Sequence, residues 1–258
     1  KIVSVAQSAE SGFRPNAEAI KAAITPKTKA IFLTTPNNPT GVVLNREELE
    51  EIAQIAIDNN LWVISDEVYG DLIFDGEHCS IASLPDMAER TVTISSLSKS
   101  HAMTGWRVGW AIGPEEIIRS MEKVALCMLY GLPGFSQEAA KVALTDLADE
   151  PQRMKEIYLT RRDLTLFALS ATPELIAHNP QAGMFLLVDV RGTGLTSRVF
   201  ADQLYEQTGV CVLDAEPFGQ SAKGHIRLSF TLSEKEIEEG CRRISHFVQS
   251  LQPTQAIA

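Results

Sequence analysis

Short apolar runs with the composition of strands alternate with helix-like spacing in the first half of the chain. Residues 30–34 and 61–65 are two such runs, rich in apolar and β-branched side chains. Between them, Asn45 and Glu48 have the spacing of a helix-capping pair. Apolar residues then recur at helical spacing, namely Leu49, Ile52 and Ile55 or Ala56. The pattern predicts a βαβ unit, in which a helix connects two parallel strands.

The alternation continues to about residue 112. Residues 91–95 and 108–112 predict two more strands, joined by a segment that contains Gly105. Pro114 and Glu115 are typical of the start of a long helix. A polar break follows at residues 149–151. We therefore expect an α/β fold whose large domain, residues 1–150, contains a mostly parallel sheet.

The second half predicts a smaller α+β domain, residues 151–258. The expected elements are, in order, a helix at 152–169, a strand at 184–190, a helix at 197–207, strands at 210–213 and 226–230, and a final helix. Ser233 and Glu236 have the spacing of a capping pair for that last helix. Its apolar stripe predicts core positions at Ile237, Cys241, Ile244, Val248 and Leu251.

Composition and charge narrow the range of partners. With 258 residues, of which 45% are hydrophobic, the chain has ample material for a buried core. Its net charge of −10 disfavours nucleic acid and anionic membrane surfaces, and no apolar run approaches the length of a membrane span. We expect a small-molecule substrate.

The four cysteines favour a reduced, cytoplasmic protein. Cys79, Cys127, Cys211 and Cys241 lie far apart, with no C-x-x-C pair. His78 beside Cys79 is better interpreted as a surface-loop histidine than as a ligand, so we expect no metal site. Residues 1–5 lack the features of a targeting signal and look like a strand. We expect that upstream sequence is absent and that the large domain is truncated at its N-terminus.

Three predicted strands are followed by unusual polar residues. These exits are residues 35–41 (TPNNPTG), 66–69 (DEVY) and 95–99 (SSLSK). Each has a simple interpretation when taken alone: a proline turn, a helix cap and a solvated lysine. Ligands of α/β sheets nevertheless collect beyond the carboxyl ends of the strands. The coincidence favours one crevice that holds an amide, a carboxylate, a phenol and a lysine.

Residues 96–109, SLSKSHAMTGWRVG, resemble the lysine attachment signature of the class I/II aminotransferases, which use pyridoxal 5'-phosphate (PLP). Residues 38–41 and 66–69 resemble two further motifs of that family, in the same order, and the resemblance extends over essentially the whole chain. It implies the PLP-transferase fold of type I, with a large domain and a smaller C-terminal domain. It also implies transfer of an amino group between an L-amino acid and a 2-oxo acid.

The resemblance implies a role for each matching residue. Lys99 would hold PLP as a Schiff base and then shuttle the substrate's α-proton. Asp66 would pair with the pyridine nitrogen of PLP, and Asn38 and Tyr69 would hydrogen-bond its phenolic oxygen. Lys99, Asp66 and Tyr69 are thus the candidate catalytic residues.

Further residues match the family's anchors for anionic groups. Ser96 and Arg107, with Ser98 as an additional hydroxyl, would bind the PLP phosphate. Arg227, in the sequence HIRLSF at 225–230, would bind the substrate's α-carboxylate, and Asn38 is a second candidate substrate-binding residue. A clamp in the second domain would also give a reason for domain closure over the substrate.

The chain departs from the family at its front. The family's N-terminal arm, its phosphate-binding loop and the aromatic residue that stacks on the PLP ring have no counterpart here. If the chain is complete, we expect it to bind PLP weakly or not at all.

Other functions fit parts of the pattern. Ser96-x-x-Lys99 also satisfies the motif of penicillin-binding acyl-transferases, but the S-D-N and K-T-G companions are missing. A PLP-sensing regulator domain without turnover, or a PLP-dependent lyase, would keep Lys99 and Asp66.

The substrate and the assembly are further expectations from the resemblance. Residues 125–131, with 96–109, are most similar to bacterial arginine:pyruvate transaminases, although aromatic and aspartate aminotransferases share the pattern. Members of the family are usually dimers, so we expect a homodimer.

Overall fold

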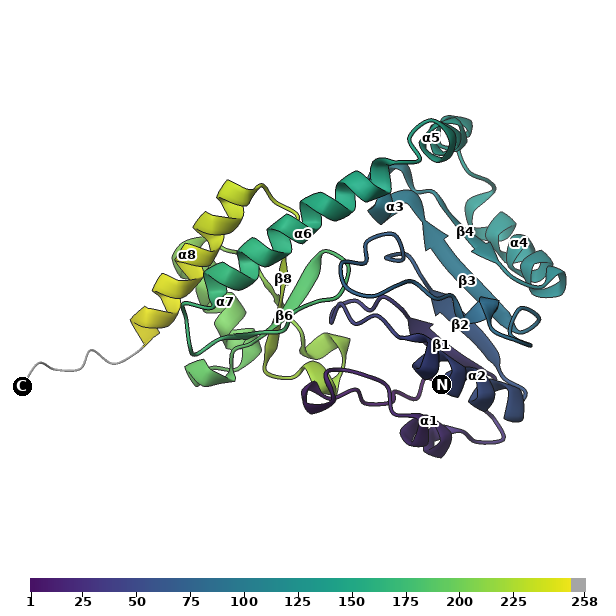
Figure 1. Ribbon diagram of the computed structural model, residues 1–258, viewed down its shortest axis with the longest axis horizontal. Helices are drawn as coiled ribbons and strands as arrows, with labels where there is room; N and C mark the ends of the chain where they lie inside the picture. Colours follow the sequence, from purple (N-terminus) through teal and green to yellow (C-terminus); the bar gives the residue numbers. More distant parts are fainter. Residues whose placement is uncertain (252–258) are drawn as a thin grey trace, which may run out of the picture.

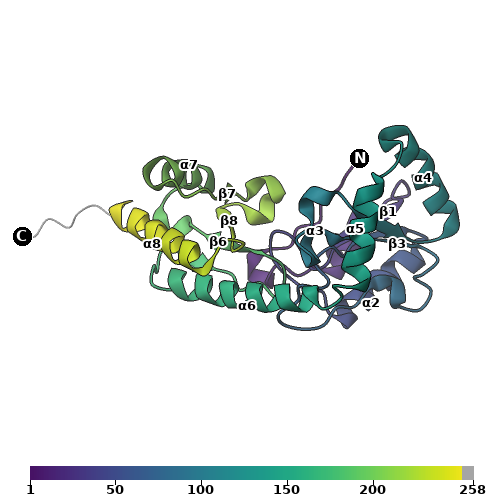
Figure 2. The ribbon, with the colours of Figure 1, turned by 90° about the horizontal axis from the view of Figure 1, so that it is seen from above.

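The chain forms two four-stranded sheets, and one long helix extends from the first sheet to the second (Figure 1). The computed structural model describes residues 1–251. The long helix is α6, Glu150–Leu169, which begins beside the first sheet and extends along the second. The view from above shows the same helix passing along one side of both parts (Figure 2).

The first sheet has the order β1-β2-β3-β4. Its strands are β1 (Ala30–Thr34), β2 (Trp62–Asp66), β3 (Thr91–Ser96) and β4 (Gly109–Ile112). The first three run parallel and β4 is antiparallel to β3. The four predicted strands are therefore confirmed, each within one residue at either end.

Helix α2 (Arg46–Asp58) connects β1 to β2, as a parallel pair of strands requires. Asn45 Oδ1 accepts a hydrogen bond from the Glu48 backbone N–H, and Glu48 Oε2 accepts one from the Asn45 N–H, so the predicted capping pair is confirmed. The apolar stripe of α2 packs on β1 and β2, with Leu49, Ile52 and Ala56 buried. This core holds the strand ends rigidly in place.

Four other helices accompany the first sheet. They are α1 (Ala17–Ala23), α3 (Leu97–Ser100), α4 (Glu115–Leu129) and α5 (Gly134–Thr145). The helix predicted after Pro114 is α4, but α5 was not anticipated. The chain breaks at Tyr130, whose φ is +58°, and α5 begins directly after Pro133. The two helices lie on the β4 side of the sheet (Figure 1).

The second sheet is antiparallel, with the order β5-β6-β8-β7. Its strands are β5 (Ile176–Ala177), β6 (Phe185–Asp189), β7 (Leu213–Asp214) and β8 (His225–Ser229). Helices α7 (Ser197–Thr208) and α8 (Glu234–Leu251) pack with α6 against it. The core between them includes fully buried Phe200, Phe230 and Phe247.

The cap and stripe of α8 follow the sequence prediction. The Ser233 N–H donates to Glu236 Oε2 and the Glu236 N–H donates to Ser233 Oγ. Of the predicted core positions, Ile237, Cys241, Ile244 and Val248 are buried and Leu251 is partly buried.

Two predicted strands differ from the structure. Residues 1–5 form no strand, because Ile2 and Val3 are exposed and have no neighbouring strand with which to pair. The strand predicted at 210–213 shortens to Leu213–Asp214, because Val210 and Val212 pack partly buried against the core as the chain leaves α7. No helix among residues 1–251 is long and apolar enough to cross a membrane.

Candidate active site

The three parallel strands end at one edge of the first sheet. Thr34 of β1 lies opposite Asp66 of β2, and Asp66 lies opposite Ile94 of β3. The three exits singled out in the sequence begin at Asp66 and directly after Thr34 and Ile94. Parallel pairing therefore brings the loop with Asn38, the turn with Tyr69 and the short helix with Lys99 to the same side of the sheet.

The exit of β1 is a loop tied by its own polar groups. Asn37 Oδ1 accepts hydrogen bonds from the Thr40 N–H at 3.3 Å and from Thr40 Oγ1 at 2.9 Å. The Asn37 N–H donates to the Val42 carbonyl, which closes the loop. This fixed loop presents Asn38, half-buried, to the second sheet.

The exit of β2 holds a carboxylate and a buried phenol. Asp66 Oδ1 accepts a hydrogen bond from the Val68 N–H at 3.2 Å, which starts a tight turn. Tyr69 at the end of that turn is only 4% exposed. Burial raises the pKa of the Tyr69 phenol to about 12, Arg227 opposes the rise and Asp66 adds to it. The phenol is therefore neutral and able to donate a hydrogen bond across the physiological range.

The exit of β3 carries the candidate lysine. Ser96 caps helix α3, its Oγ accepting from the Ser98 N–H at 3.3 Å. Lys99 lies in this one-turn helix and is half-buried. Its Nζ lies 5.9 Å from the centre of the Tyr69 ring. Lys99 and Tyr69, which come from different strand exits, thus face each other.

Arg227 reaches the same place from the second sheet. Its Nη1 donates to Asn38 Oδ1 at 3.0 Å, across 189 positions of sequence. The guanidinium carbon lies 4.1 Å from the centre of the Phe185 ring and 4.8 Å from that of Phe218. Burial lowers the pKa of Arg227, while Tyr69 raises it. Two aromatic faces and one amide therefore hold a cation partly out of water.

Arg107 occupies a different position from the other predicted residues. It is exposed, follows a one-turn helix at Thr104–Trp106, and has a positive φ of 56°. Its Nη1 donates to the Thr104 carbonyl at 2.8 Å. The structure thus assembles Asn38, Tyr69, Lys99 and Arg227, with Asp66 at the strand end, but leaves the Arg107 guanidinium on its own loop.

A buried polar cluster that the sequence reasoning missed lies behind this site. Glu67 is only 6% exposed. Its Oε1 accepts from Ser65 Oγ and Ser80 Oγ, each at 2.8 Å, and its Oε2 is 2.9 Å from His78 Nε2. His78 is exposed in a loop, as predicted, and it also pairs with this carboxylate. The adjacent acidic pair Asp66-Glu67 was the only signal in the sequence.

Phe185 and Phe218 were also missed, because aromatic residues on a strand and in a loop look like ordinary core residues. A cavity of about 510 Å³ lies elsewhere, between residues 8–10 and the start of α7. None of the predicted site residues lines it. The described part of the chain contains no group of three or more His, Cys, Asp or Glu side chains arranged to hold a metal ion.

Comparison with known proteins assigns the chain to a family. The sequence model described as aminotransferase class I and II matches residues 1–244. The arginine–pyruvate transaminase AruH of Pseudomonas aeruginosa is 51% identical over 95% of this chain and 62% of that protein. An aspartate aminotransferase of Bacillus sp. (strain YM-2) is 39% identical over 96% of this chain and 64% of that protein.

The solved structures agree. The crystal structure of the aromatic aminotransferase from Pyrococcus horikoshii OT3 matches with a TM-score of 0.92 and 35% identity, covering 96% of this chain and 67% of that chain. The chain thus spans 62% to 64% of the length of the two curated relatives.

Proposed function

The chain belongs to the aminotransferase class I and II family and has its PLP-dependent transferase fold, and on that premise we propose that it forms the cofactor- and substrate-binding core of a transaminase. The reaction would move an amino group between an L-amino acid and a 2-oxo acid. The hydrogen bond between Arg227 and Asn38 is the single observation that best supports this proposal. It joins the candidate substrate clamp of the second sheet to the candidate cofactor site of the first.

The donors at the strand exits fit the groups of PLP. PLP has an aldehyde, a phenolic oxygen, a pyridine nitrogen and a phosphate, and the site offers an amine (Lys99), a neutral phenol (Tyr69), an amide (Asn38) and a carboxylate (Asp66). When bound, PLP supplies an electron sink for the bonding electrons of the substrate's Cα–H bond. Asp66 would hold the proton on the pyridine nitrogen that this role needs.

Lys99 is proposed to anchor the cofactor and move the proton. Its Nζ would bond covalently to the cofactor until the substrate's amino group replaces it. The freed, neutral Nζ would then accept the proton from the substrate's Cα and return it at the cofactor's carbon. The Tyr69 ring, 5.9 Å away, limits the space through which Nζ can swing.

Tyr69 and Asn38 are proposed to hydrogen-bond the phenolic oxygen. The raised pKa of Tyr69 keeps its phenol protonated, so it can donate to an anionic oxygen. Arg227 Nη1 donates a hydrogen bond to the Asn38 amide oxygen, so the amide N–H₂ is the group that would donate to the cofactor. The two residues would thus stabilise negative charge on the phenolic oxygen.

The phosphate would bind where α3 begins. Ser96 and Ser98 contribute hydroxyls at the N-terminus of this helix, and Arg107 a guanidinium. Arg107 lies on an exposed loop, where its Nη1 donates a hydrogen bond to the Thr104 carbonyl. We propose that it exchanges this neutral partner for the dianion.

Arg227 would bind the substrate's α-carboxylate through a bidentate contact. The ring of Phe185 and that of Phe218 restrict its guanidinium to one plane, which favours a fork-shaped contact. We propose L-arginine and pyruvate as the substrate pair, on the 51% identity with the arginine–pyruvate transaminase AruH. Recognition of an arginine side chain would need carboxylates at the mouth of the pocket.

The proposal extends to domains and assembly. We propose a boundary near residue 150, where α6 begins and spans the two sheets, so that residues 1–150 and 151–258 close over the substrate. We further propose a cytoplasmic homodimer. The four free cysteines are compatible with a reducing compartment.

Product analysis tests the proposal. The chain is incubated with PLP, L-arginine and pyruvate, and alanine and the 2-oxo acid of arginine are quantified by chromatography. Both products are expected in equal amounts, and neither with Lys99→Ala. Release of ammonia without alanine would indicate a lyase. The absence of any product with all common amino acids, despite covalent capture of PLP at Lys99, would favour a sensor domain.

A further inference from the structure

We propose that Gln181 is a positioning residue that holds the loop of Asn38 and the turn of Tyr69 in one arrangement. The inference rests on the proposed function, because it concerns how those two residues come to face one ligand. Gln181 lies outside every motif described above, in the segment that leads into β6. Its importance comes from the number of separate chain segments that it joins.

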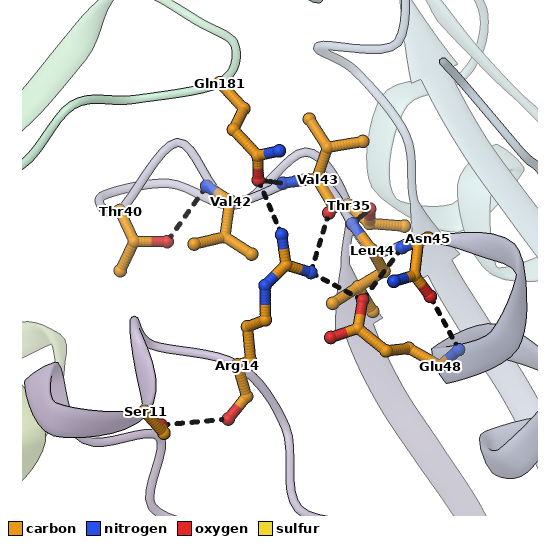
Figure 3. A network of polar contacts seen from close by, with 10 residues as sticks. All are labelled: Ser11, Arg14, Thr35, Thr40, Val42, Val43, Leu44, Asn45, Glu48 and Gln181. Carbon is orange, nitrogen blue, oxygen red and sulfur yellow. Dashed lines mark hydrogen bonds and ion pairs between the residues drawn. The ribbon is translucent and has the colours of Figure 1, made fainter. Parts of the chain in front are cut away.

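The side chain of Gln181 links three segments (Figure 3). Its Oε1 accepts a hydrogen bond from Arg14 Nη2 at 2.9 Å and from the Val43 N–H at 3.1 Å. Arg14 in turn donates through Nη1 to Glu48 Oε2 at 2.6 Å and to the Val43 carbonyl at 3.3 Å. Glu48 is the capping residue of α2. One amide oxygen thereby connects the N-terminal segment, the strand-exit loop and helix α2.

The backbone of Gln181 links two more points. Its N–H donates to the Gly41 carbonyl at 3.0 Å. Its carbonyl accepts from the Phe74 N–H at 2.8 Å and from the Asp75 N–H at 3.1 Å. Gly41 closes the loop that carries Asn38, and Phe74 follows the turn that carries Tyr69. Gln181 is therefore hydrogen-bonded both to the loop that carries Asn38 and to the segment that follows the turn of Tyr69.

The contact at Gly41 is too close for any other residue. A Cβ built at Gly41 would lie 2.3 Å from Pro180 Cβ and 2.9 Å from the Ala182 carbonyl oxygen. Gly41 also has a positive φ of 71°. The loop thus docks backbone to backbone on residues 180–182.

The residues after Gln181 continue to the other site groups. The Gly183 N–H donates to the Leu72 carbonyl, and the Leu72 N–H donates to the Tyr69 carbonyl, each at 2.9 Å. A Cβ at Gly183 would lie 3.6 Å from the Tyr69 ring. Phe185, two residues later, stacks on Arg227. One short segment therefore touches the supports of Asn38, Tyr69 and Arg227.

The amide oxygen of Gln181 is the replaceable part of this arrangement. Without it, the Val43 N–H and one guanidinium N–H lose their acceptor in a half-buried place, and the loop is held to residues 180–182 by backbone hydrogen bonds alone. A glutamate at position 181 would accept from the same two donors. A methionine would fill nearly the same volume and accept from neither. These two variants separate hydrogen bonding from packing.

The experiment compares Gln181→Met, Gln181→Glu and a control, Gln54→Met, on the exposed face of α2. Hydrogen exchange by mass spectrometry is measured on residues 37–43 and 72–75 of the cofactor-free chain. The yield of borohydride-fixed PLP on Lys99 is measured at one limiting PLP concentration. We expect Gln181→Met to exchange roughly 3- to 10-fold faster in both segments and to give a proportionally lower yield. Gln181→Glu and Gln54→Met should match the unchanged chain.

Equal exchange in Gln181→Met and Gln181→Glu, or no change in either, overturns the inference. A rise in exchange with an unchanged Lys99 yield shows a purely structural role and overturns it as well. If the unchanged chain captures no PLP at Lys99, the proposed function fails, and the exchange comparison alone decides whether Gln181 holds the two loops. Should Gln181→Met not fold, Arg14→Lys, which removes one donor to Oε1, is measured in the same way, with a smaller rise expected in the same segments.

Discussion

The setting of Tyr69 differs strongly from that of a free tyrosine side chain. Its phenol is buried, and its pKa is influenced by the charges of the Asp66 carboxylate and the Arg227 guanidinium. Burial dominates the shift, because ionisation would place a negative charge where solvent cannot reach it. The residue is thus suited to donate a hydrogen bond and unsuited to act as a base near neutral pH.

A pH titration tests this setting. In the unfolded chain the phenol ionises near its ordinary pKa of 10, whereas in the folded chain Tyr69 keeps its proton to about pH 12. The stability from its neutral form is complete below pH 10 and is lost as the pH rises through 12. We expect an ultraviolet phenolate step near pH 12 in the folded chain that is absent in Tyr69→Phe. Retention of that step in the variant would contradict the assignment.

Arg227 offers a second test at the scale of one residue. Arg227→Lys keeps the charge but loses the planar fork between the two aromatic rings. We expect kcat/KM in the product assay to fall by roughly 30- to 150-fold, which corresponds to about 2–3 kcal/mol for a charge-assisted contact. Arg242→Lys, an exposed change on α8, serves as the control. A loss below about threefold would argue against Arg227 as the carboxylate clamp.

At this scale, the site residues that could be predicted from the sequence are those within contiguous motifs. Asp66, Tyr69 and Lys99 follow strands that could be predicted, so their convergence could be predicted too. Gln181 could not be found in this way, because its partners, Arg14 and Val43, lie more than 130 positions away. Long-range hydrogen bonds leave no local pattern in one sequence.

Among the elements, α2 connects local sequence with site geometry most directly. Its capping residue Glu48 serves both the helix start and Arg14, so the cap is part of the support for the strand-exit loop. Asn45→Ala removes the side chain that accepts the Glu48 N–H. We expect this change to lower the free energy of unfolding by about 1 kcal/mol, measured by urea denaturation. Glu51→Ala, on the exposed face of α2, should change it by less than about 0.5 kcal/mol.

A loss in Asn45→Ala no greater than that in Glu51→Ala would show that the cap contributes nothing to stability.

Most elements, like α2, could be predicted because each has a period, a cap or a breaker in its own sequence. α5 and the short β5 could not. The start of α5 depends on the break at Tyr130, and β5 exists only through pairing of Ile176 and Ala177 with β6.

The whole molecule leaves a large apolar surface over α4, the loop after it and α5. The exposed side chains there include Val124, Leu126, Met128, Leu129, Tyr130, Leu132, Phe135, Val142 and Leu144. Monomeric proteins rarely expose so many neighbouring apolar residues. The two helices account for the spacing of these side chains, which stay exposed in this chain.

We expect this surface to drive association of the chain with a second copy. Met128 is 73% exposed and Phe135 is 72% exposed, so Met128→Glu with Phe135→Glu should leave the core intact. The double variant is expected to sediment as a smaller species than the unchanged chain across a concentration series. Phe167→Glu on α6, where the side chain is 79% exposed, is the control and should behave like the unchanged chain. A chain that is monomeric at every concentration would refute the expectation.

The arrangement of the two sheets was predictable only in outline. The polar break near residue 150 indicated two parts, and α6 begins at this break and runs without interruption to Leu169. The meeting of Arg227 with Asn38 depends on how α6 sets one sheet against the other, and no local pattern encodes that placement. The family resemblance supplied it where periodicity could not.

Covalent binding of PLP at Lys99 is the proposal on which all the others depend. The chain is mixed with PLP at a concentration well below saturation, reduced with borohydride and digested, and the modified lysine is identified by mass spectrometry. Reduction makes the bond permanent, so the assay also detects weak binding. We predict that the label is concentrated on Lys99 and that total labelling falls to background in Lys99→Ala. Label spread over other lysines, with the same total in Lys99→Ala, would contradict the account.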